Sequence, residues 1–175
     1  MPRLDLDPIK VTQELAALQR KLGYGLGALR RAADARPGFS PRRQIFQLDD
    51  VRLYRYTPAD ENRTRIPLLI VYALVNRPDM VDLQADRSLV EALLARGFDV
   101  YLLDWGEPGP ADRTRGLADY LCRHLDSAVA ALLARLKRKT INLLGVCQGG
   151  TFSRCHAALF PRKCKGLVAL VSVDV

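Results

Sequence analysis

The chain has 175 residues and a formal net charge of +8, and 49% of its residues are hydrophobic against 26% that are charged. Such a length and composition are typical of one globular domain that can bury a sizeable core. No apolar run reaches the roughly 18 residues of a membrane-spanning helix, and the acidic, proline-containing start does not resemble a secretory signal. We therefore expect no spanning helix and a cytoplasmic location.

The basic residues are spread along the chain, with 27 Lys and Arg against 19 Asp and Glu. Two interpretations stay open: a solvated surface, or attraction to an anionic substrate or partner. The densest basic stretch, Arg135–Lys139, is short and falls at the end of a predicted helix, where cations suit the helix dipole. We therefore expect no nucleic-acid partner.

The four cysteines form no C-x-x-C pair and have no metal-ligand spacing with the two histidines. We predict no metal site, and a cytoplasmic chain of this size needs no disulfide. At least one thiol is then available for chemistry. The cysteines are Cys122, Cys147, Cys155 and Cys164, and the histidines are His124 and His156.

Apolar residues at three- and four-residue steps predict an amphipathic helix from Thr12 to Ala33. A Pro-Gly linker follows it, so we expect an amino-terminal helix and linker over residues 1–36 and a catalytic domain over 37–175. The apolar stripe of the helix, Val11 to Leu29, either packs against its own domain or docks on a partner or a hydrophobic surface.

After the linker, strands and helices alternate, which predicts a parallel sheet with right-handed crossovers; a leading hairpin makes the sheet mixed. The sequence ends directly at the last predicted strand, so we expect the loop that would follow that strand to be absent from these 175 residues. The predicted strands are 44–48, 51–56, 68–75, 98–103, 140–146 and 166–173, and the predicted helices are 87–96, 117–137 and 149–160.

The segment Ile141–Gly150 reads as a strand, a sharp turn and the start of a helix. It has the form G-x-C-x-G, the nucleophile elbow of an α/β-hydrolase fold with Cys147 in place of serine. Gly145 and Gly149 flank the cysteine where side chains would clash with the neighbouring strand and helix. The helix start favours a thiolate, and the N–H of Gln148 would be one oxyanion donor. The alternative is a buried structural cysteine in a glycine-rich turn.

A second oxyanion donor is expected in the loop after strand 68–75, at Val75 or Asn76. A cysteine nucleophile also needs a histidine base and an acid. We expect neither histidine to be the base, because His156 lies roughly 180° around its helix from Cys147 and His124 lies in the preceding helix. The fold's chain order is nucleophile, acid, histidine, so both partners should lie beyond residue 175.

Four segments together resemble the polyhydroxyalkanoate synthases, specifically the short class III catalytic subunit. The resemblance implies an acyltransferase that polymerises (R)-3-hydroxyacyl-CoA, typically 3-hydroxybutyryl-CoA, through a cysteine thioester. It assigns the thioester to Cys147 and the oxyanion positions to Val75 and Gln148, with no cofactor, because the coenzyme A thioester is the substrate. The segments are Leu53–Tyr56, Pro67–Pro78, Asp99–Gly106 and Asn142–Gly150.

The resemblance also implies a second, non-catalytic synthase subunit, an oligomer and attachment to cytoplasmic polymer granules. Members of the family are about twice as long, with their aspartate and histidine in the other half. We therefore expect a truncated form with its carboxy-terminal part missing and little activity alone. Two alternatives stay open: a cysteine-elbow hydrolase of esters or lactones, and a non-catalytic fragment that binds the partner subunit or the granule.

Overall fold

The computed structural model describes residues 38–58, 66–107 and 109–172. The chain divides into two compact units, Met1–Arg36 and Pro37–Val175, and the description below concerns the second. The predicted helix at 12–33 and its docking stripe lie outside the described residues, as do the end of the predicted loop at 57–65 and the end of the predicted strand at 166–173. None of the described helices is both long and apolar enough to cross a membrane.

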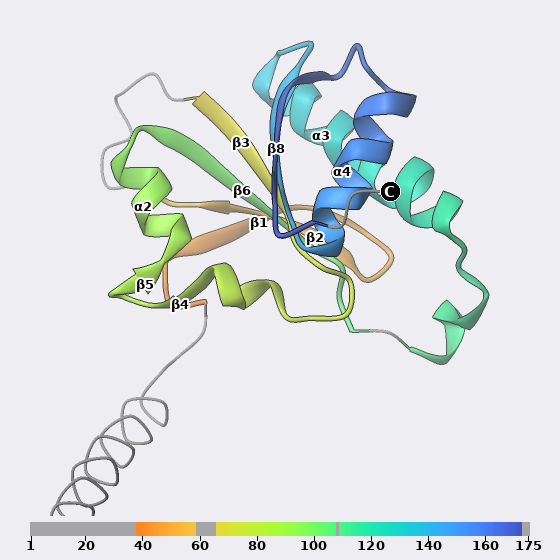
Figure 1. Ribbon diagram of the computed structural model, residues 1–175, viewed down its shortest axis with the longest axis horizontal. Helices are drawn as coiled ribbons and strands as arrows, with labels where there is room; N and C mark the ends of the chain where they lie inside the picture. Colours follow the sequence, from red (N-terminus) through yellow and green to blue (C-terminus); the bar gives the residue numbers. More distant parts are fainter. Residues whose placement is uncertain (1–37, 59–65, 108, 173–175) are drawn as a thin grey trace, which may run out of the picture. The chain divides into compact units, whose positions relative to one another are not determined.

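The elements alternate along the chain as strand and helix after an opening hairpin (Figure 1). The strands are β1 (Arg42–Leu48), β2 (Val51–Tyr56), β3 (Ile66–Val71), β4 (Asp82–Gln84), β5 (Arg87–Ser88), β6 (Phe98–Asp104), β7 (Ile141–Val146) and β8 (Cys164–Leu170). The helices are η1 (Pro78–Val81), α2 (Leu89–Ala95), η2 (Pro110–Thr114), the π-helix η3 (Asp119–Leu125), α3 (Asp126–Leu136) and α4 (Gln148–Leu159).

Within the described residues, the main sheet has six strands in the order β1-β2-β6-β3-β7-β8. The hairpin β1–β2 joins β6 in antiparallel fashion, whereas β6, β3, β7 and β8 run parallel. The predicted α/β fold with a mixed, mostly parallel sheet is therefore confirmed. Because the carboxyl ends of the parallel strands meet at one edge, the loops after β3, β6 and β7 gather there.

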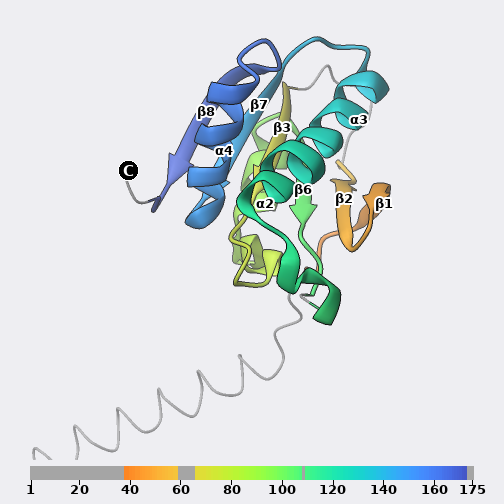
Figure 2. The ribbon, with the colours of Figure 1, turned by 90° about the vertical axis from the view of Figure 1, so that its right-hand side faces the viewer.

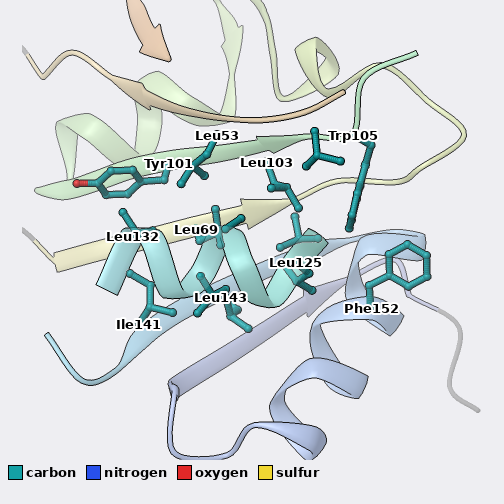
Figure 3. Packing of buried hydrophobic residues seen from close by; sticks show 14 of the residues in the cluster. Leu53, Leu69, Tyr101, Leu103, Trp105, Leu125, Leu132, Ile141, Leu143 and Phe152 are labelled. Carbon is teal, nitrogen blue, oxygen red and sulfur yellow. The ribbon is translucent and has the colours of Figure 1, made fainter. Parts of the chain in front are cut away.

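Helices cover both faces of the sheet, with α2 on one side and α3 and α4 on the other (Figures 1 and 2). Side chains of a strand alternate between the two faces, so β3 sends Leu69 and Val71 into the core under α3 and sends Leu68 and Ile70 into the core under α2. Burial on both faces explains why this strand is a continuous apolar run. Figure 3 shows the larger of the two cores, in which Leu69 and Leu143 meet Leu125 and Leu132.

Several predicted elements have the wrong bounds, and two of them differ for reasons that their contacts explain. The strand expected over 68–75 ends at Val71, because Ala73 and Leu74 are apolar loop residues that pack against the core and so resemble a longer strand. The helix expected over 87–96 begins at Leu89, because β5 (Arg87–Ser88) pairs with β4. Ser88 instead caps the helix, since its Oγ accepts the Glu91 N–H at 3.0 Å.

Other differences are smaller. The chain is helical from Leu117, as predicted. Its segment η3 is a π-helix, and α3 follows it directly as an α-helix. The last strand begins at Cys164, earlier than the predicted start at 166. The short elements η1, η2, β4 and β5 were not predicted, because pieces of two to five residues are too short to show a hydrophobic period.

Candidate active site

Cys147 lies between the last residue of β7 and the first residue of α4. Its backbone has φ 56° and ψ −128°, a conformation that is costly for a residue with a side chain. Two hydrogen bonds hold this conformation: the Cys147 N–H donates to the Leu170 carbonyl at 2.8 Å, and the Cys147 carbonyl accepts the Gly150 N–H at 2.9 Å. The residue itself is exposed and its thiol is free. The local backbone therefore presents the sulfur side chain at the carboxyl edge of the sheet.

The two predicted elbow glycines stand at close backbone contacts. A Cβ on Gly145 would lie 2.5 Å from the Gly150 Cα, and a Cβ on Gly149 would lie 2.0 Å from the Val71 carbonyl oxygen. Neither distance is compatible with a side chain, and in both cases the obstacle is backbone, which cannot swing aside. The absence of side chains thus lets α4 begin directly beside the end of β3.

The loop after β3 is tied to the elbow. The Oε1 of Gln148, the first residue of α4, accepts the Leu74 N–H at 3.1 Å. The Nε1 of Trp105 donates to the Tyr72 carbonyl at 3.0 Å. Val75 follows in the chain and is exposed. Two side chains from distant segments therefore fix the backbone of the loop that carries the predicted second oxyanion position.

The Gln148 N–H lies in the first turn of α4, where a helix offers its amides no acceptor of its own. The role of this N–H as the first oxyanion donor stays a prediction. The Gln148 side-chain contact and the Trp105 contact were missed from sequence. The only sequence signal for Trp105 is its place directly after β6, at the same edge as the elbow.

Three aromatic side chains, Trp105, Tyr120 and Phe152, pack against one another beside α4 (Figure 3 labels Trp105 and Phe152). The ring of Trp105 meets Phe152 edge-on with centroids 5.5 Å apart, and it meets Tyr120 edge-on at 5.8 Å. Tyr120 also stacks on Phe152 at 6.3 Å. Such pairs stabilise beyond the area that they bury. The cluster joins η3, α4 and the loop after β6 behind the elbow.

Both histidines are fully buried, and each faces an aspartate. His124 Nε2 lies 3.0 Å from the Asp49 carboxylate, and His156 Nε2 lies 3.1 Å from Asp126. The His124 hydrogen bond is the main cause that lowers the pKa of Asp49. Burial lowers the pKa of His156, although Asp126 opposes this effect. The Nε2 atom of each histidine therefore has an aspartate as its partner. The base that would activate Cys147 stays a prediction for residues beyond 175.

A pocket of about 610 Å³ lies beside the elbow, at the ends of β3 and β6. Leu74 and Val75 line it, but Cys147 does not. Its charges are of both signs, and Arg42 is already paired with Asp79 at 2.9 Å. The net positive charge of the chain is therefore not concentrated here. The charged lining residues are Arg42, Arg52 and Arg77 with Asp50, Asp79, Asp104 and Glu107.

Among residues 38–58, 66–107 and 109–172, no three His, Cys, Asp or Glu side chains are grouped as metal ligands. The other three cysteines are also free thiols, with Cys122 exposed and Cys155 packed against the larger core.

The sequence of the sheet and elbow matches a known family. The family model described as the alpha/beta hydrolase fold matches residues 66–174, which include β3 to β8. The chain belongs to the alpha/beta hydrolase fold family. Solved members of this fold are similar to it, among them a predicted CIB-like hydrolase from Thermoplasma acidophilum with a TM-score of 0.55 and 14% identity, over 78% of this chain and 65% of that one. An epoxide hydrolase from Vigna radiata has a TM-score of 0.54 and 17% identity, over 78% and 41%.

Within the alpha/beta hydrolase fold family, the curated relatives with high identity are polymerase subunits. A poly(3-hydroxyalkanoate) polymerase subunit PhaC from Synechocystis sp. is 55% identical over 79% of this chain and 37% of its own length. The subunits of the same name from Thiocystis violacea and Allochromatium vinosum are 46% and 45% identical, over 98% and 97% of this chain and 49% and 48% of theirs. The resemblance seen in the sequence is confirmed. The chain spans about half the length of these relatives or less.

Proposed function

We propose that the chain is the nucleophile-bearing part of a polyhydroxyalkanoate synthase, in which Cys147 carries the acyl group as a thioester. The observation that carries the proposal is the strained, exposed Cys147 at the start of α4. Identity of 45–46% to poly(3-hydroxyalkanoate) polymerase subunits over nearly the whole chain supports it and favours 3-hydroxyacyl-CoA as the substrate.

The chemistry is an acyl transfer between thiols. The Cys147 sulfur loses its proton and attacks the thioester carbonyl, and a new carbon–sulfur bond forms as the bond to coenzyme A breaks. Backbone N–H groups of Gln148 and Val75 stabilise the negative oxygen of the tetrahedral intermediate. Coenzyme A leaves as the thiolate and takes a proton. One thioester replaces another of similar energy, so the growing chain can move between carriers.

Chain extension needs a second step. The hydroxyl of the next 3-hydroxyacyl-CoA attacks the enzyme thioester and gives its proton to a base; an ester bond forms, and Cys147 leaves as a thiolate. That thiolate then attacks the thioester of the extended chain, which returns to Cys147 as coenzyme A is released. An aspartate and a histidine beyond residue 175 would activate the thiol and the hydroxyl. We therefore propose that this chain alone has little polymerising activity.

The resemblance to the polymerase subunits also suggests where the protein works and with which partner. We propose that the protein works on cytoplasmic polymer granules, as an oligomer with a second, non-catalytic subunit. The word "subunit" in the names of the Thiocystis violacea and Allochromatium vinosum relatives is consistent with such a partner.

The test offers 3-hydroxybutyryl-CoA to the chain and measures coenzyme A release and products. We expect slow release that Cys147→Ala abolishes and that Cys122→Ala, which removes another exposed thiol, leaves unchanged. Free 3-hydroxybutyrate as the sole sustained product would favour the hydrolase alternative. Release at the rate of a complete polymerase would contradict the proposed dependence on residues beyond 175.

A further inference from the structure

Residues 127–173 carry the whole net positive charge of the chain. They contain eight Lys and Arg and no Asp or Glu, whereas the other 19 Lys and Arg are balanced by 19 Asp and Glu elsewhere. In the structure this part comprises most of α3, then β7, α4 and β8. A solvated surface normally carries both signs of charge interspersed. Basic residues are thus spread along the sequence, but the acids that would balance them are not.

Two basic turns lie side by side at the amino end of β7 and β8. One turn joins α3 to β7 and the other joins α4 to β8, both at the end of the sheet opposite to the start of α4 (Figure 2). The Ile141 N–H donates to the Lys163 carbonyl at 2.9 Å, and Ile141 is the register partner of Cys164, so the two turns meet through their backbones. The exposed cations of this surface form the basic edge, which consists of Lys137, Arg138, Lys139, Arg162 and Lys165.

The basic edge is not neutralised by the part of the chain that the structure describes. Lys163, in the same turn, is paired with Asp126 at 2.7 Å, but no ion pair between described residues includes a cation of the basic edge. The exposed helix positions nearby, Ala134 and Ala158, hold alanine where an acid could sit one helical turn away. Five positive charges therefore face solvent together.

The helix dipole explains only part of this charge. Cations are stabilised near the carboxyl end of a helix, and the effect falls off within the last turn. Lys139 lies three residues beyond the end of α3, and Arg162 lies three residues beyond the end of α4. Lys165 belongs to a strand. These three cations need another explanation than the ends of the helices.

Lys137 has a backbone conformation that favours glycine. Its φ of 52° and ψ of 42° are left-handed, and it follows the last residue of α3. The Lys137 N–H donates to the Ala134 carbonyl at 3.2 Å, and the Arg138 N–H donates to the Leu133 carbonyl at 3.0 Å. Both hydrogen bonds hold the turn that a glycine usually makes. A lysine at this position presents a cation on a fixed turn, at a cost in backbone conformation.

We propose that the basic edge binds the phosphate backbone of a nucleic-acid duplex without reading its sequence. Interfaces with nucleic acid are strongly positive, whereas the cores of protein–protein interfaces are depleted of lysine, and three of the five cations are lysines. Attachment to a lipid surface needs an apolar anchor beside the charge. Within residues 133–140 and 158–166, Leu159 is the one large apolar side chain that is exposed.

The aromatic side chains favour a duplex over a single strand. Proteins that hold single strands stack the bases on exposed rings. Phe160 is the aromatic residue in the two turns, and its ring is engaged by His156 at 5.0 Å between centroids and by the Lys163 Nζ at 5.0 Å. The sequence favoured no nucleic-acid partner because Arg135–Lys139 is short by itself. The fold places the cations of the second turn beside that stretch.

The basic edge is remote from the elbow. It lies at the amino end of β7, and Cys147 follows the carboxyl end of this six-residue strand, about 20 Å away at the usual rise per residue. A duplex bound to the basic edge would leave the thiol open. The proposal therefore does not rest on the proposed function, and Cys147→Ala should bind a duplex as well as the unaltered chain does.

The test titrates the 175-residue chain into a labelled DNA duplex of mixed sequence and measures fluorescence anisotropy. Five phosphate contacts predict that the logarithm of the association constant falls against the logarithm of the salt concentration with a slope of roughly −4 to −5. Doubling the salt concentration should then weaken binding roughly twentyfold. Absence of binding to the duplex at low salt would overturn the proposal.

A pair of double variants separates the basic edge from net charge alone. Lys139→Gln with Arg162→Gln should weaken binding about tenfold or more and reduce the salt slope by roughly 2. Arg87→Gln with Arg113→Gln is the matched control, because it lowers the net charge equally at exposed positions elsewhere, and it should change binding less than about twofold. All four side chains are exposed, so both variants should fold, as circular dichroism checks. Equal weakening by the two variants would overturn the proposal.

Three other probes test the choice of partner. The duplex should bind more tightly than a single strand of the same sequence, because its charge is denser and no ring is free for stacking. Poly-glutamate at equal total charge should displace the duplex poorly for the same reason of charge density. Tighter binding to poly-glutamate, to the single strand, or to phosphatidylglycerol-containing vesicles, lost in the Lys139→Gln and Arg162→Gln variant, would assign the basic edge to that partner and overturn the duplex.

Discussion

Strands β3 and β8 flank the elbow strand β7 on opposite sides, and they differ in what surrounds them. The side chains from Leu68 to Val71 in β3 are buried on both faces, whereas Val168 and Leu170 of β8 are open. On the β3 side, α4 lies against the end of β3 at Gly149, and the side chains of Gln148 and Trp105 hydrogen-bond to the backbone of the loop after β3. The comparison teaches that the described residues bury the neighbour of the elbow strand on the β3 side and leave apolar side chains exposed on the β8 side, although the Leu170 carbonyl of β8 still accepts the Cys147 N–H.

Gly149→Ala should break the β3 side most severely. The added Cβ would lie 2.0 Å from the Val71 carbonyl oxygen, so α4 must move away from the strand. We expect a loss of roughly 3 kcal/mol or more in the free energy of unfolding, measured in urea. Gly109→Ala is the control, because a Cβ there meets nothing nearer than 3.9 Å, and it should change stability little. Equal stability of the two variants would mean that the contact between α4 and β3 is not as tight as described.

Truncation of one residue in each strand compares the two sides directly. Leu69→Ala removes a fully buried side chain and should cost about 2–5 kcal/mol. Val168→Ala removes a half-exposed one and should change the chain alone by less than about 0.5 kcal/mol. Similar losses in the two urea titrations would contradict the uncovered state of the β8 face.

Loss of the hydrogen bond between the Gln148 side chain and the loop after β3 should have a moderate effect on stability. Gln148→Ala leaves the Leu74 N–H without its acceptor and should lower the free energy of unfolding by about 1–2 kcal/mol. If the loop positions an oxyanion donor, acylation of Cys147 should slow about tenfold as well. Gln44→Ala, which removes an exposed hydrogen bond to Gln47 on β1, should change neither quantity. A stability loss without slower acylation would separate the loop from catalysis.

A pH dependence should be the smallest effect. Burial lowers the pKa of His156 below 6.5, so the unfolded chain binds a proton more readily than the folded chain does. The stability contributed by neutral His156 is present above about pH 6.5 and declines as the pH falls below it. Replacement by His156→Gln should flatten this part of the profile in urea titrations between pH 5 and pH 8. An unchanged slope would assign the acid sensitivity to other groups.

The strand, turn and helix start around Cys147 could be predicted from the sequence because they are local. Gly145, Cys147 and Gly149 follow one another within a strand, a turn and a helix start, and the apolar run before them identifies β7. The end of β3 could not be read in the same way. Ala73 and Leu74 are apolar because they pack against the core, and a strand and a buried loop give the same apolar run.

Contacts between distant segments could not be predicted from the sequence. Gln148 and Leu74 are far apart in the chain, and so are Trp105 and Tyr72, so no spacing rule connects them. The buried pairs of His124 with Asp49 and of His156 with Asp126 were missed for the same reason. The uncovered face of β8 likewise appears only once the strand order is known.

The central claim is that Cys147 is the residue that carries the acyl group. Peptide mapping by mass spectrometry, after brief incubation with 3-hydroxybutyryl-CoA and an acid quench, tests it directly. We predict a mass increase of one hydroxybutyryl group on the peptide that contains Cys147, and none on the peptide with Cys122, which is also exposed. Equal labelling of both peptides, or labelling that persists in Cys147→Ala, would contradict the account.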